Sequence, residues 1–274
     1  MNTGLRSKLV RSTQLRFQRR ELKYYLAQEL YPELIRLIRP YMRLDEHLKQ
    51  REAKSYLVRS LYLDTNDLKL YHEKLDGSSQ RKKFRIRGYN DNRSEIFLEI
   101  KQKYNDIVIK ERALVDYEEL PKILDCYGIN SSSFLFDQTF SFKKRKSLDG
   151  GYNPNGKRSS SEIKVLNSFL FFIPFLQLHP TVLIAYEREA YTGIFDDSVR
   201  LTIDRNLKCL PGRFAYDLFY KGTDWAFVNS RCILELKFNG SLPLCFKRII
   251  QQLNLWTEAI SKYCLCIEKC GELY

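Results

Sequence analysis

The sequence lacks the residues and motifs on which many familiar catalytic sites depend. It contains only three histidines, His47, His72 and His179, and no H-x-x-x-H pair, so neither a histidine metal site nor a Ser-His-Asp triad is indicated. It also has no G-x-x-x-x-G-K-[ST] loop and no G-x-G-x-x-G turn after a strand. These two absences argue against a P-loop and against a Rossmann nucleotide site.

Cysteines are scattered and have no metal-binding spacing. There are seven, an odd number, so the disulfide framework of a small secreted domain is not expected. Cys264, Cys266 and Cys270 lie close together, but the paired C-x2-C spacing of zinc sites is missing and the segment is typical of a buried strand. We interpret them as structural thiols of a cytoplasmic protein.

A signal peptide and long uninterrupted hydrophobic runs are also missing. The N-terminal segment MNTGLRSKLVRS has no apolar h-region. The longest apolar run, over 165–185, is too interrupted to span a bilayer, because it contains Asn167, Pro174, Gln177, His179 and Pro180. We therefore predict a soluble protein without a transmembrane segment in this chain, and nothing indicates a membrane partner.

What the chain has in excess is positive charge. Its 274 residues carry a formal net charge of +13. Such a charge favours anionic partners such as nucleic acid, anionic lipid or a phosphate compound, although many soluble proteins are basic for no specific purpose. Hydrophobic residues make up 44% of the chain, with 17 Phe and 18 Tyr, which is enough for an ordered core.

The charges follow a regular pattern, in which every second residue is charged and apolar residues lie between. The clearest stretches are Arg81-Lys83-Arg85-Arg87, Glu99-Lys101-Lys103, Lys110-Arg112, Arg200-Thr202-Asp204 and Arg231-Ile233-Glu235-Lys237. A period of two is the period of a strand, so each stretch puts its charges on one face of a sheet. A sheet that buries one face and gathers cations on the other is suited to binding a polyanion.

The remaining periodicities predict an α+β fold. Strands are expected over 17–25, 56–62, 81–89, 95–103, 107–115, 181–191, 199–205, 213–220 and 231–238, and helices over 27–41, 116–128 and 241–262, with a short one ending near Leu75. We predict a closed antiparallel β-barrel of about eight strands, with a charged tunnel and flanking helices. The chain would form a single domain, 1–274, with a mobile basic insert over 143–161.

Two interpretations of the charged face remain open from the pattern alone. The charges could lie on the water-facing side of a two-layer sheet, where they would form weak ion pairs. Alternatively they line a tunnel, in which arginine forks and lysine point charges bind a triphosphate or a longer chain. The tunnel would hold Arg85, Arg87, Lys101, Lys103, Arg188, Arg200 and Lys237, with the carboxylates Glu21, Glu99, Asp204 and Glu235 available to hold Mn²⁺ or Mg²⁺.

Short motifs in a fixed order favour the tunnel. From about Arg19 to Lys262 they read R-R-E-L-K-Y, S-L-Y-L-D-T, R-K-K-F-R-I-R-G-Y, L-E-I-K-Q-K, Y-E-R-E-A-Y, V-R-L-T-I-D, L-E-L-K-F and I-S-K-Y. The ordered set resembles the vacuolar-transporter-chaperone (VTC) domain of polyphosphate polymerases. That family belongs to the triphosphate tunnel group, whose fold is an antiparallel barrel with a charged bore.

The resemblance implies roles for individual residues. Catalytic contacts to the phosphates are expected from Arg85, Arg87, Lys101, Arg188 and Arg200. The resemblance implies substrate binding by Lys23 and by Lys262, which is predicted at the end of a helix. The alternating charge pattern adds four more predicted substrate-binding residues, Lys103, Lys110, Arg112 and Lys237. Glu235, helped by Glu99 or Glu21, would hold the Mn²⁺ or Mg²⁺ cofactor.

The function implied by the resemblance is metal-dependent transfer of the γ-phosphoryl group of ATP to a growing polyphosphate chain, with release of ADP. ATP and polyphosphate would be the partners, and nucleic acid is not favoured. Two alternatives are a tunnel-type triphosphatase and a non-catalytic module that binds polyphosphate or RNA. The chain departs from the triphosphatase pattern E-x-E-x-K, since its first strand reads Arg19-x-Glu21-x-Lys23. It also has Ala259 where eukaryotic polymerases carry a second lysine.

Overall fold

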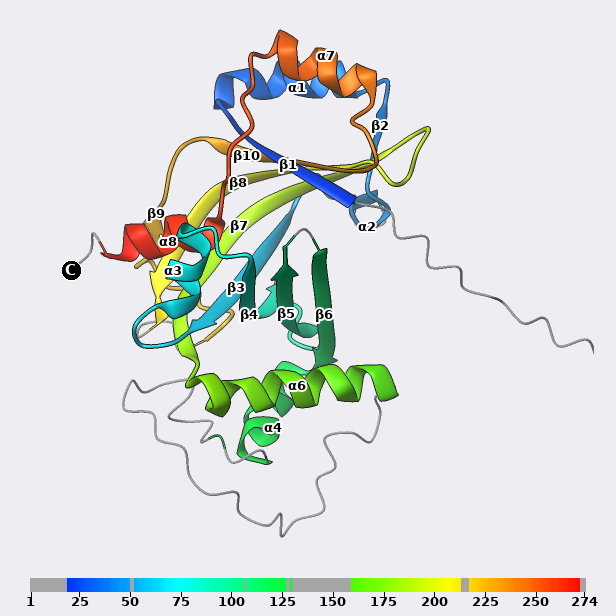
Figure 1. Cartoon of the computed structure of the whole chain (residues 1–274). Coiled ribbons are helices and arrows are strands. Elements are labelled where there is room, and N and C mark those ends of the chain that lie inside the picture. The colour runs from blue at the N-terminus through cyan, green and yellow to red at the C-terminus, as the bar shows by residue number, and fades with distance from the viewer. Residues whose placement is uncertain are drawn as a thin grey trace, which may run out of the picture.

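An antiparallel sheet forms the centre of the computed structural model and curls around its polar face (Figure 1). The structure describes residues 19–49, 52–105, 107–126, 129, 159–212 and 217–271. The strands are β1 (Arg19–Leu26), β2 (Met42–Leu44), β3 (Tyr56–Asp64), β4 (Gln80–Tyr89), β5 (Ile96–Tyr104), β6 (Ile107–Val115), β7 (His179–Gly193), β8 (Arg200–Pro211), β9 (Ala226–Phe227) and β10 (Cys232–Asn239). The helices are α1 (Tyr31–Ile38), α2 (Glu46–Lys49), α3 (Lys69–Leu75), α4 (Leu120–Cys126), α6 (Ser160–Leu176), α7 (Leu244–Gln252) and α8 (Lys262–Gly271), with 3-10 turns η1 (Gln28–Leu30) and η2 (Tyr117–Glu119).

The sheet is open, so the prediction of a closed barrel is wrong. Its strands follow the order β1-β10-β8-β7-β3-β4-β5-β6, with β2 paired to β7 and β9 to β8. Within the described residues, the end strands β1 and β6 do not pair with each other. A period of two assigns side chains to faces in an open curled sheet and in a barrel alike, so it cannot reveal whether the end strands meet. The α+β class, the antiparallel pairing and the flanking helices are confirmed.

Helices α1 and α7 cover the convex face of the wing formed by β1, β10 and β8 (Figure 1). Ile38 of α1 and Phe246 of α7 belong to the same buried cluster as Leu234 and Leu236 of β10. The two β10 residues alternate with the charged side chains of the same strand, as the period of two predicted. This packing leaves the polar face of the wing on the concave side.

The other wing is formed by β4, β5 and β6, and its convex face packs against α6. This helix was not predicted from the sequence. Phe169 and Ile173 of α6 are buried with Phe84 of β4 and Leu98 of β5. The phenyl rings of Phe84 and Phe169 meet edge to face, with centroids 6.0 Å apart. Each wing therefore has its own helical cover, and both polar faces look into the same concavity.

The start of α6 corrects the predicted insert. The Ser159 hydroxyl accepts a hydrogen bond from the Glu162 backbone, and the Glu162 carboxylate accepts one from the Ser159 backbone, which makes a capping box. Residues 159–161 therefore belong to the helix start and not to an insert, while 143–158 lie outside the described residues. The S-x-x-E signal was present in the sequence, but the serine-rich run around it hid the boundary.

The predicted long helix over 241–262 is two helices with an extended segment between them. Helix α7 stops at Gln252, and Asn254 follows with a left-handed φ of 49°, a conformation that commonly ends helices. The chain then pairs with β1 through a bridge between Tyr24 and Thr257, and α8 begins at Lys262. Lys262 therefore starts a helix, whereas the sequence placed it at a helix end.

Helix α8 fills one end of the concavity. Cys264, Cys266 and Cys270 lie on this helix and are buried with Val182 and Ile233 of the sheet, so the strand predicted for the segment 265–267 is wrong. Their role as buried thiols stays an interpretation, and the described residues contain no group of three or more metal-binding side chains placed around a common point.

Two further expectations can be compared with the structure. Of the predicted strand over 213–220, residues 213–216 lie outside the described residues and 217–220 form a turn. No helix in the described ranges is long and apolar enough to cross a membrane.

Truncation of Phe84 should destabilise the fold, because its side chain is 0% exposed between the sheet and α6. We expect Phe84→Ala to lower the free energy of unfolding by about 3–5 kcal/mol, since it leaves a cavity. Phe195→Ala is the control, because that ring is 84% exposed, and it should change stability by less than about 0.5 kcal/mol. Chemical denaturation of both variants checks this, and equal effects would contradict the packing described above.

Candidate functional site

The concave face gathers the charged side chains that the sequence singled out. On each strand they alternate with residues buried in the convex clusters, which fixes the face on which they lie. The face carries Glu21 and Lys23 of β1, Glu235 and Lys237 of β10, Arg200 and Asp204 of β8, Arg188 of β7, Arg85 and Arg87 of β4, Glu99, Lys101 and Lys103 of β5, Lys110 and Arg112 of β6, and Lys262 at the start of α8.

Asp204 is the centre of one ionic group. The Arg188 guanidinium grips it with two parallel hydrogen bonds, Nε to Oδ1 at 2.6 Å and Nη2 to Oδ2 at 2.7 Å. The Lys262 ammonium lies 2.6 Å from Oδ2. Burial alone would raise the pKa of Asp204, but the charges of Arg188 and Lys262 outweigh it and hold the pKa below its usual value.

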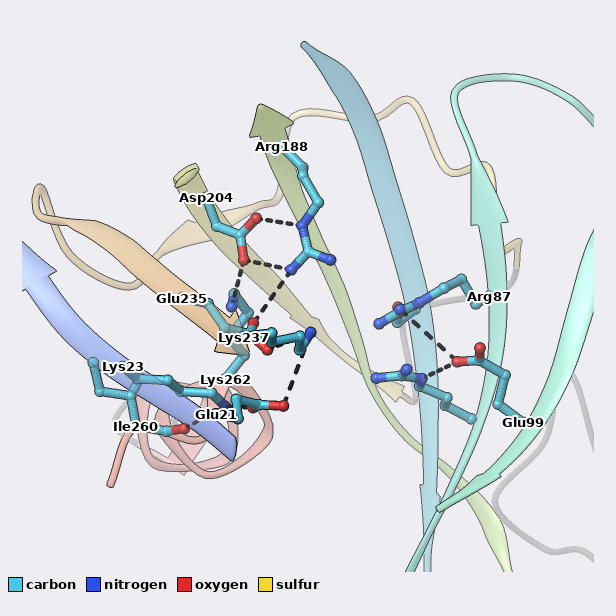
Figure 2. A network of polar contacts seen from close by, with 12 residues as sticks. Glu21, Lys23, Arg87, Glu99, Arg188, Asp204, Glu235, Lys237, Ile260 and Lys262 are labelled. Atoms are coloured by element: carbon cyan, nitrogen blue, oxygen red, sulfur yellow. Dashed lines mark hydrogen bonds and ion pairs between the residues drawn. The ribbon is translucent and has the colours of Figure 1, made fainter. Parts of the chain in front are cut away.

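Glu235 extends this group toward β1. Its Oε1 lies 2.6 Å from Lys237 Nζ, and its Oε2 lies 3.8 Å from Arg188 Nη2. Burial raises the pKa of Glu235, yet the surrounding lysines and Arg188 lower it well below the usual range. Glu21 lies 3.2 Å from Lys23 and 3.8 Å from Lys237. The three strands of this wing and the adjacent β7 therefore share one continuous network (Figure 2).

Glu99 is the centre of a second ionic group on the other wing. Its Oε2 accepts a 2.5 Å hydrogen bond from Arg85 Nε and lies 3.8 Å from Arg87 Nη1, while Lys110 Nζ lies 3.1 Å from its Oε1. Burial would raise the pKa of Glu99, but these cations lower it to about 2. Arg85 also donates to the Tyr62 hydroxyl at 3.0 Å.

Tyr62 responds to the same cations. Burial would raise the pKa of its phenol, but the charges of Arg85, Arg87 and Lys83 outweigh that effect and lower the pKa to about 8. A phenol with so low a pKa reports a strongly positive local potential, which is the property expected of an anion-binding face.

Several cations on this face have no carboxylate partner among the described residues. Lys101, Lys103 and Arg200 form no ion pair or hydrogen bond with other described side chains. Burial lowers the pKa of Lys101. Across the concavity, the charge of Glu21 partly offsets this decrease and the charge of Lys23 adds to it. The Arg112 guanidinium lies over the Phe97 ring, 5.1 Å from its centre.

The two ionic groups face one another across the concavity. Figure 2 shows the ends of Arg188 and Lys237 on one side and of Arg87 on the other, all directed into the space between them. Cations outnumber the carboxylates on this face, and a desolvated cation without a counter-ion raises the energy of the empty state. Arginine and lysine groups arranged in this way can bind several oxygens of a phosphate compound at once.

Comparison with known families agrees with this geometry. The family model described as "VTC domain" matches residues 18–270, which is nearly the whole chain. The chain belongs to the VTC-domain family.

Other comparisons add less about this VTC-family chain. A search of curated proteins gives no match. Among solved structures, the PH1819 protein from Pyrococcus horikoshii OT3 has a TM-score of 0.41 and 10% identity, with 91% of this chain and 99% of that chain covered. A Vibrio parahaemolyticus protein described as a "putative adenylate cyclase" has a TM-score of 0.40 and 11% identity, with 91% of this chain and 97% of that chain covered. At these values neither likeness carries functional information.

The concave face of this VTC-family chain brings together two of the three predicted metal ligands, Glu21 and Glu235. In phosphate sites Mg²⁺ is held by one or two carboxylates together with phosphate oxygens. Glu21 and Glu235 reach a common point, since both lie within 3.8 Å of Lys237 Nζ. Glu99 lies on the opposite wing (Figure 2). Its two oxygens form ion pairs with Arg85 and Lys110. The structure therefore separates Glu99 from the predicted metal ligands Glu21 and Glu235.

Sequence reasoning missed some members of the site. Tyr62, on β3, was read only as part of a strand, although it holds Arg85. Lys83 was noted in the alternating pattern but not chosen as a site residue. Asp204 was named only among the carboxylates available to hold a metal ion, yet it anchors Arg188 and Lys262. Alternation had already put Lys83 and Asp204 on the charged face, whereas β3 has no alternating charges that would have singled out Tyr62.

The Glu99 ion pairs should make stability depend on acid pH. The pKa of Glu99 in the folded protein is about 2, below its ordinary value of 4.5, and this difference contributes about 3 kcal/mol to the free energy of unfolding. This contribution is present above pH 4.5 and is lost as the pH falls from about 4.5 to about 2. Glu99→Gln should therefore destabilise the protein at pH 7 and flatten this acid limb, as measured by denaturation at several pH values.

Glu118→Gln is the control for that experiment, because the Glu118 side chain is 74% exposed. It should follow the acid limb of the unsubstituted protein. An unchanged acid limb in Glu99→Gln would contradict the ionic group described for this wing.

Proposed function

We propose that this chain is a metal-dependent polyphosphate polymerase, which transfers the γ-phosphoryl group of ATP to the end of a polyphosphate chain and releases ADP. The observation that carries the proposal is the convergence of cations from both wings on one concave face, several of them without a carboxylate partner. Membership of the VTC-domain family supports the same conclusion. The proposed substrates, ATP and polyphosphate, share the closely spaced anionic oxygens that such a face would bind.

The two wings would hold the phosphates from opposite sides. Arg188 is fixed by Asp204 and Arg85 by Glu99, so both guanidinium groups are oriented before a ligand arrives. Such preorganised donors stabilise charge that develops in a transition state without having to reorganise. Arg200 and Lys101, which have no ion pair in the described structure, would contact the phosphates directly.

Phosphoryl transfer on this face would depend on positioning and neutralisation of charge more than on a strong base. The terminal oxygen of a phosphate chain is already anionic, so the acceptor needs no protein group to remove a proton. Glu235 and Glu21 would hold Mn²⁺ or Mg²⁺ beside the phosphate oxygens. When bound, that ion supplies neutralisation of charge on the transferred group.

Product analysis tests the proposal against its alternatives. Purified protein incubated with ATP and Mn²⁺ should release ADP and produce a ladder of polyphosphate on a polyacrylamide gel. Release of inorganic phosphate without a ladder would indicate a triphosphatase, in which water accepts the phosphoryl group. Binding of polyphosphate without ADP release would indicate a non-catalytic module.

Arg200 offers a second test, because its side chain is exposed and makes no ion pair with the described residues. Arg200→Met should lower the rate of ADP release about 100-fold or more, the order of effect seen when one donor to the developing charge is removed, while the unfolding temperature stays unchanged. Arg36→Met removes an arginine that is 66% exposed on α1, outside the concave face, and should leave the rate unaltered. Similar rates in both variants would exclude a direct role for Arg200.

A further inference from the structure

Lys83 lies on the concave face next to Arg85 but forms no ion pair with a described carboxylate. It belongs to the same face of β4 as Arg85 and Arg87, because these residues alternate with the buried Phe84 and Ile86. Its ammonium donates to the Ser261 hydroxyl at 3.0 Å. An inward-facing lysine is thus held by a neutral hydroxyl, with no opposite charge to compensate it.

Lys83 is also part of a row of like charges. It lies opposite Lys101 on β5, and Lys101 lies opposite Lys110 on β6. Side chains in such positions have Cβ atoms about 4.5–5.5 Å apart, and like charges opposite one another are destabilising. Only Lys110 contacts a carboxylate, that of Glu99. The row therefore raises the energy of the empty face and would be relieved by an anion lying across it.

The pKa values of the row agree with this description. Burial lowers the pKa of Lys83 to about 8 and also lowers the pKa of Lys101 and Lys110. Tyr62 and Cys264 partly offset the effect at Lys83, while Lys23 and Lys101 add to it. The cationic form of Lys83 thus lacks the compensation that Lys262 receives from Asp204.

The Lys83 end of the face adjoins the start of α8. Ser261 Oγ accepts a hydrogen bond from the Cys264 backbone at 3.4 Å and so caps that helix, while Lys23 donates to the Ile260 carbonyl at 3.1 Å. Lysines from β1 and β4 thus meet at this end, where the described residues that accept their hydrogen bonds at 260–261 are uncharged. Phosphate oxygens are stronger acceptors for an ammonium than either of these groups.

We propose that Lys83 is a further substrate-binding residue, which contacts the part of a long phosphate chain that lies beyond the phosphates held by Arg85 and Arg87. The identity of the ligand rests on the proposed function. Arg87 and Lys83 are four residues apart on one strand, so their Cα atoms are about 13 Å apart. A long chain can follow the strand past all three cations, whereas a triphosphate leaves part of the row empty.

The test compares the affinities of two probes, long-chain inorganic polyphosphate and inorganic triphosphate, by calorimetric titration at pH 7. Lys83→Met should weaken binding of the long chain about tenfold, the loss expected for one charge-assisted hydrogen bond. Binding of triphosphate should change less than about twofold. Lys83→Arg, which keeps the charge, should retain most of the affinity for the long chain.

Lys82→Met is the matched control. Lys82 is the adjacent residue on the opposite face of β4, with its ammonium 5.5 Å from the centre of the Phe172 ring. Its loss should leave both affinities unchanged. A thermal unfolding scan without ligand separates binding from structure, because Lys83→Met should unfold at the same or a higher temperature once one charge of the row is removed.

Two results would overturn the inference: an equal loss of affinity for both probes, or no loss for the long chain. A lowered unfolding temperature together with equal losses would identify Lys83 as a structural support for α8. These outcomes differ from a failure of the proposed function. If Lys83→Met selectively loses long-chain binding but the unsubstituted protein releases no ADP, the Lys83 site stands and the polymerase function does not. If the unsubstituted protein makes polymer but Lys83→Met binds the long chain as before, the polymerase function stands and the Lys83 site does not.

Discussion

Compensation of buried positive charge is the constraint on which the concave face depends. The fold draws cations from two wings into one concavity and supplies fewer carboxylates than are needed to neutralise them. Each of two carboxylates pairs with two cations: Asp204 with Arg188 and Lys262, and Glu99 with Arg85 and Lys110. The paired cations are thereby oriented, and the unpaired ones remain available. Stability and affinity are opposed here, since each additional carboxylate would stabilise the empty protein and weaken its attraction for a polyanion.

Most of the charged face could be predicted because a strand period is strict. Once Phe84 and Ile86 are assigned to the core, Arg85 and Arg87 must lie on the other side, whatever the curvature of the sheet. The same reasoning placed Glu235 and Lys237 on one face of their strand and Leu234 and Leu236 on the other face, and the structure agrees. Alternation says nothing about how strands distant in sequence are arranged around the concavity. Glu21 and Glu99 therefore looked equivalent in the sequence as helpers of Glu235, and only the strand order separates Glu99 from the other two.

The errors have identifiable physical causes. The helix over 160–176 was missed because its apolar run has no polar stripe marked enough to show a helical period, and Pro174 interrupts it near its end. The break between α7 and α8 was missed because apolar residues continue through 253–260 at nearly helical spacing. There, Ile260 belongs to the cluster around α8, while Trp256 is 75% exposed. The spacing of apolar residues indicates that they are buried, but it does not indicate which element they pack against.

Under the proposed function, the lack of pairing between β1 and β6 in the described residues has a consequence for how a polymer would reach the face. A closed tube must be threaded from an end, which restricts it to chain termini and makes entry slower as the chain lengthens. An open trough, whose two edge strands are not hydrogen-bonded to each other, admits a segment from the side. That segment can come from the middle of a polymer chain of any length. On the proposed function, capture of an internal stretch and handling of a terminus would then be separate events, and a polyphosphate chain that has slipped could be re-seated without being released completely.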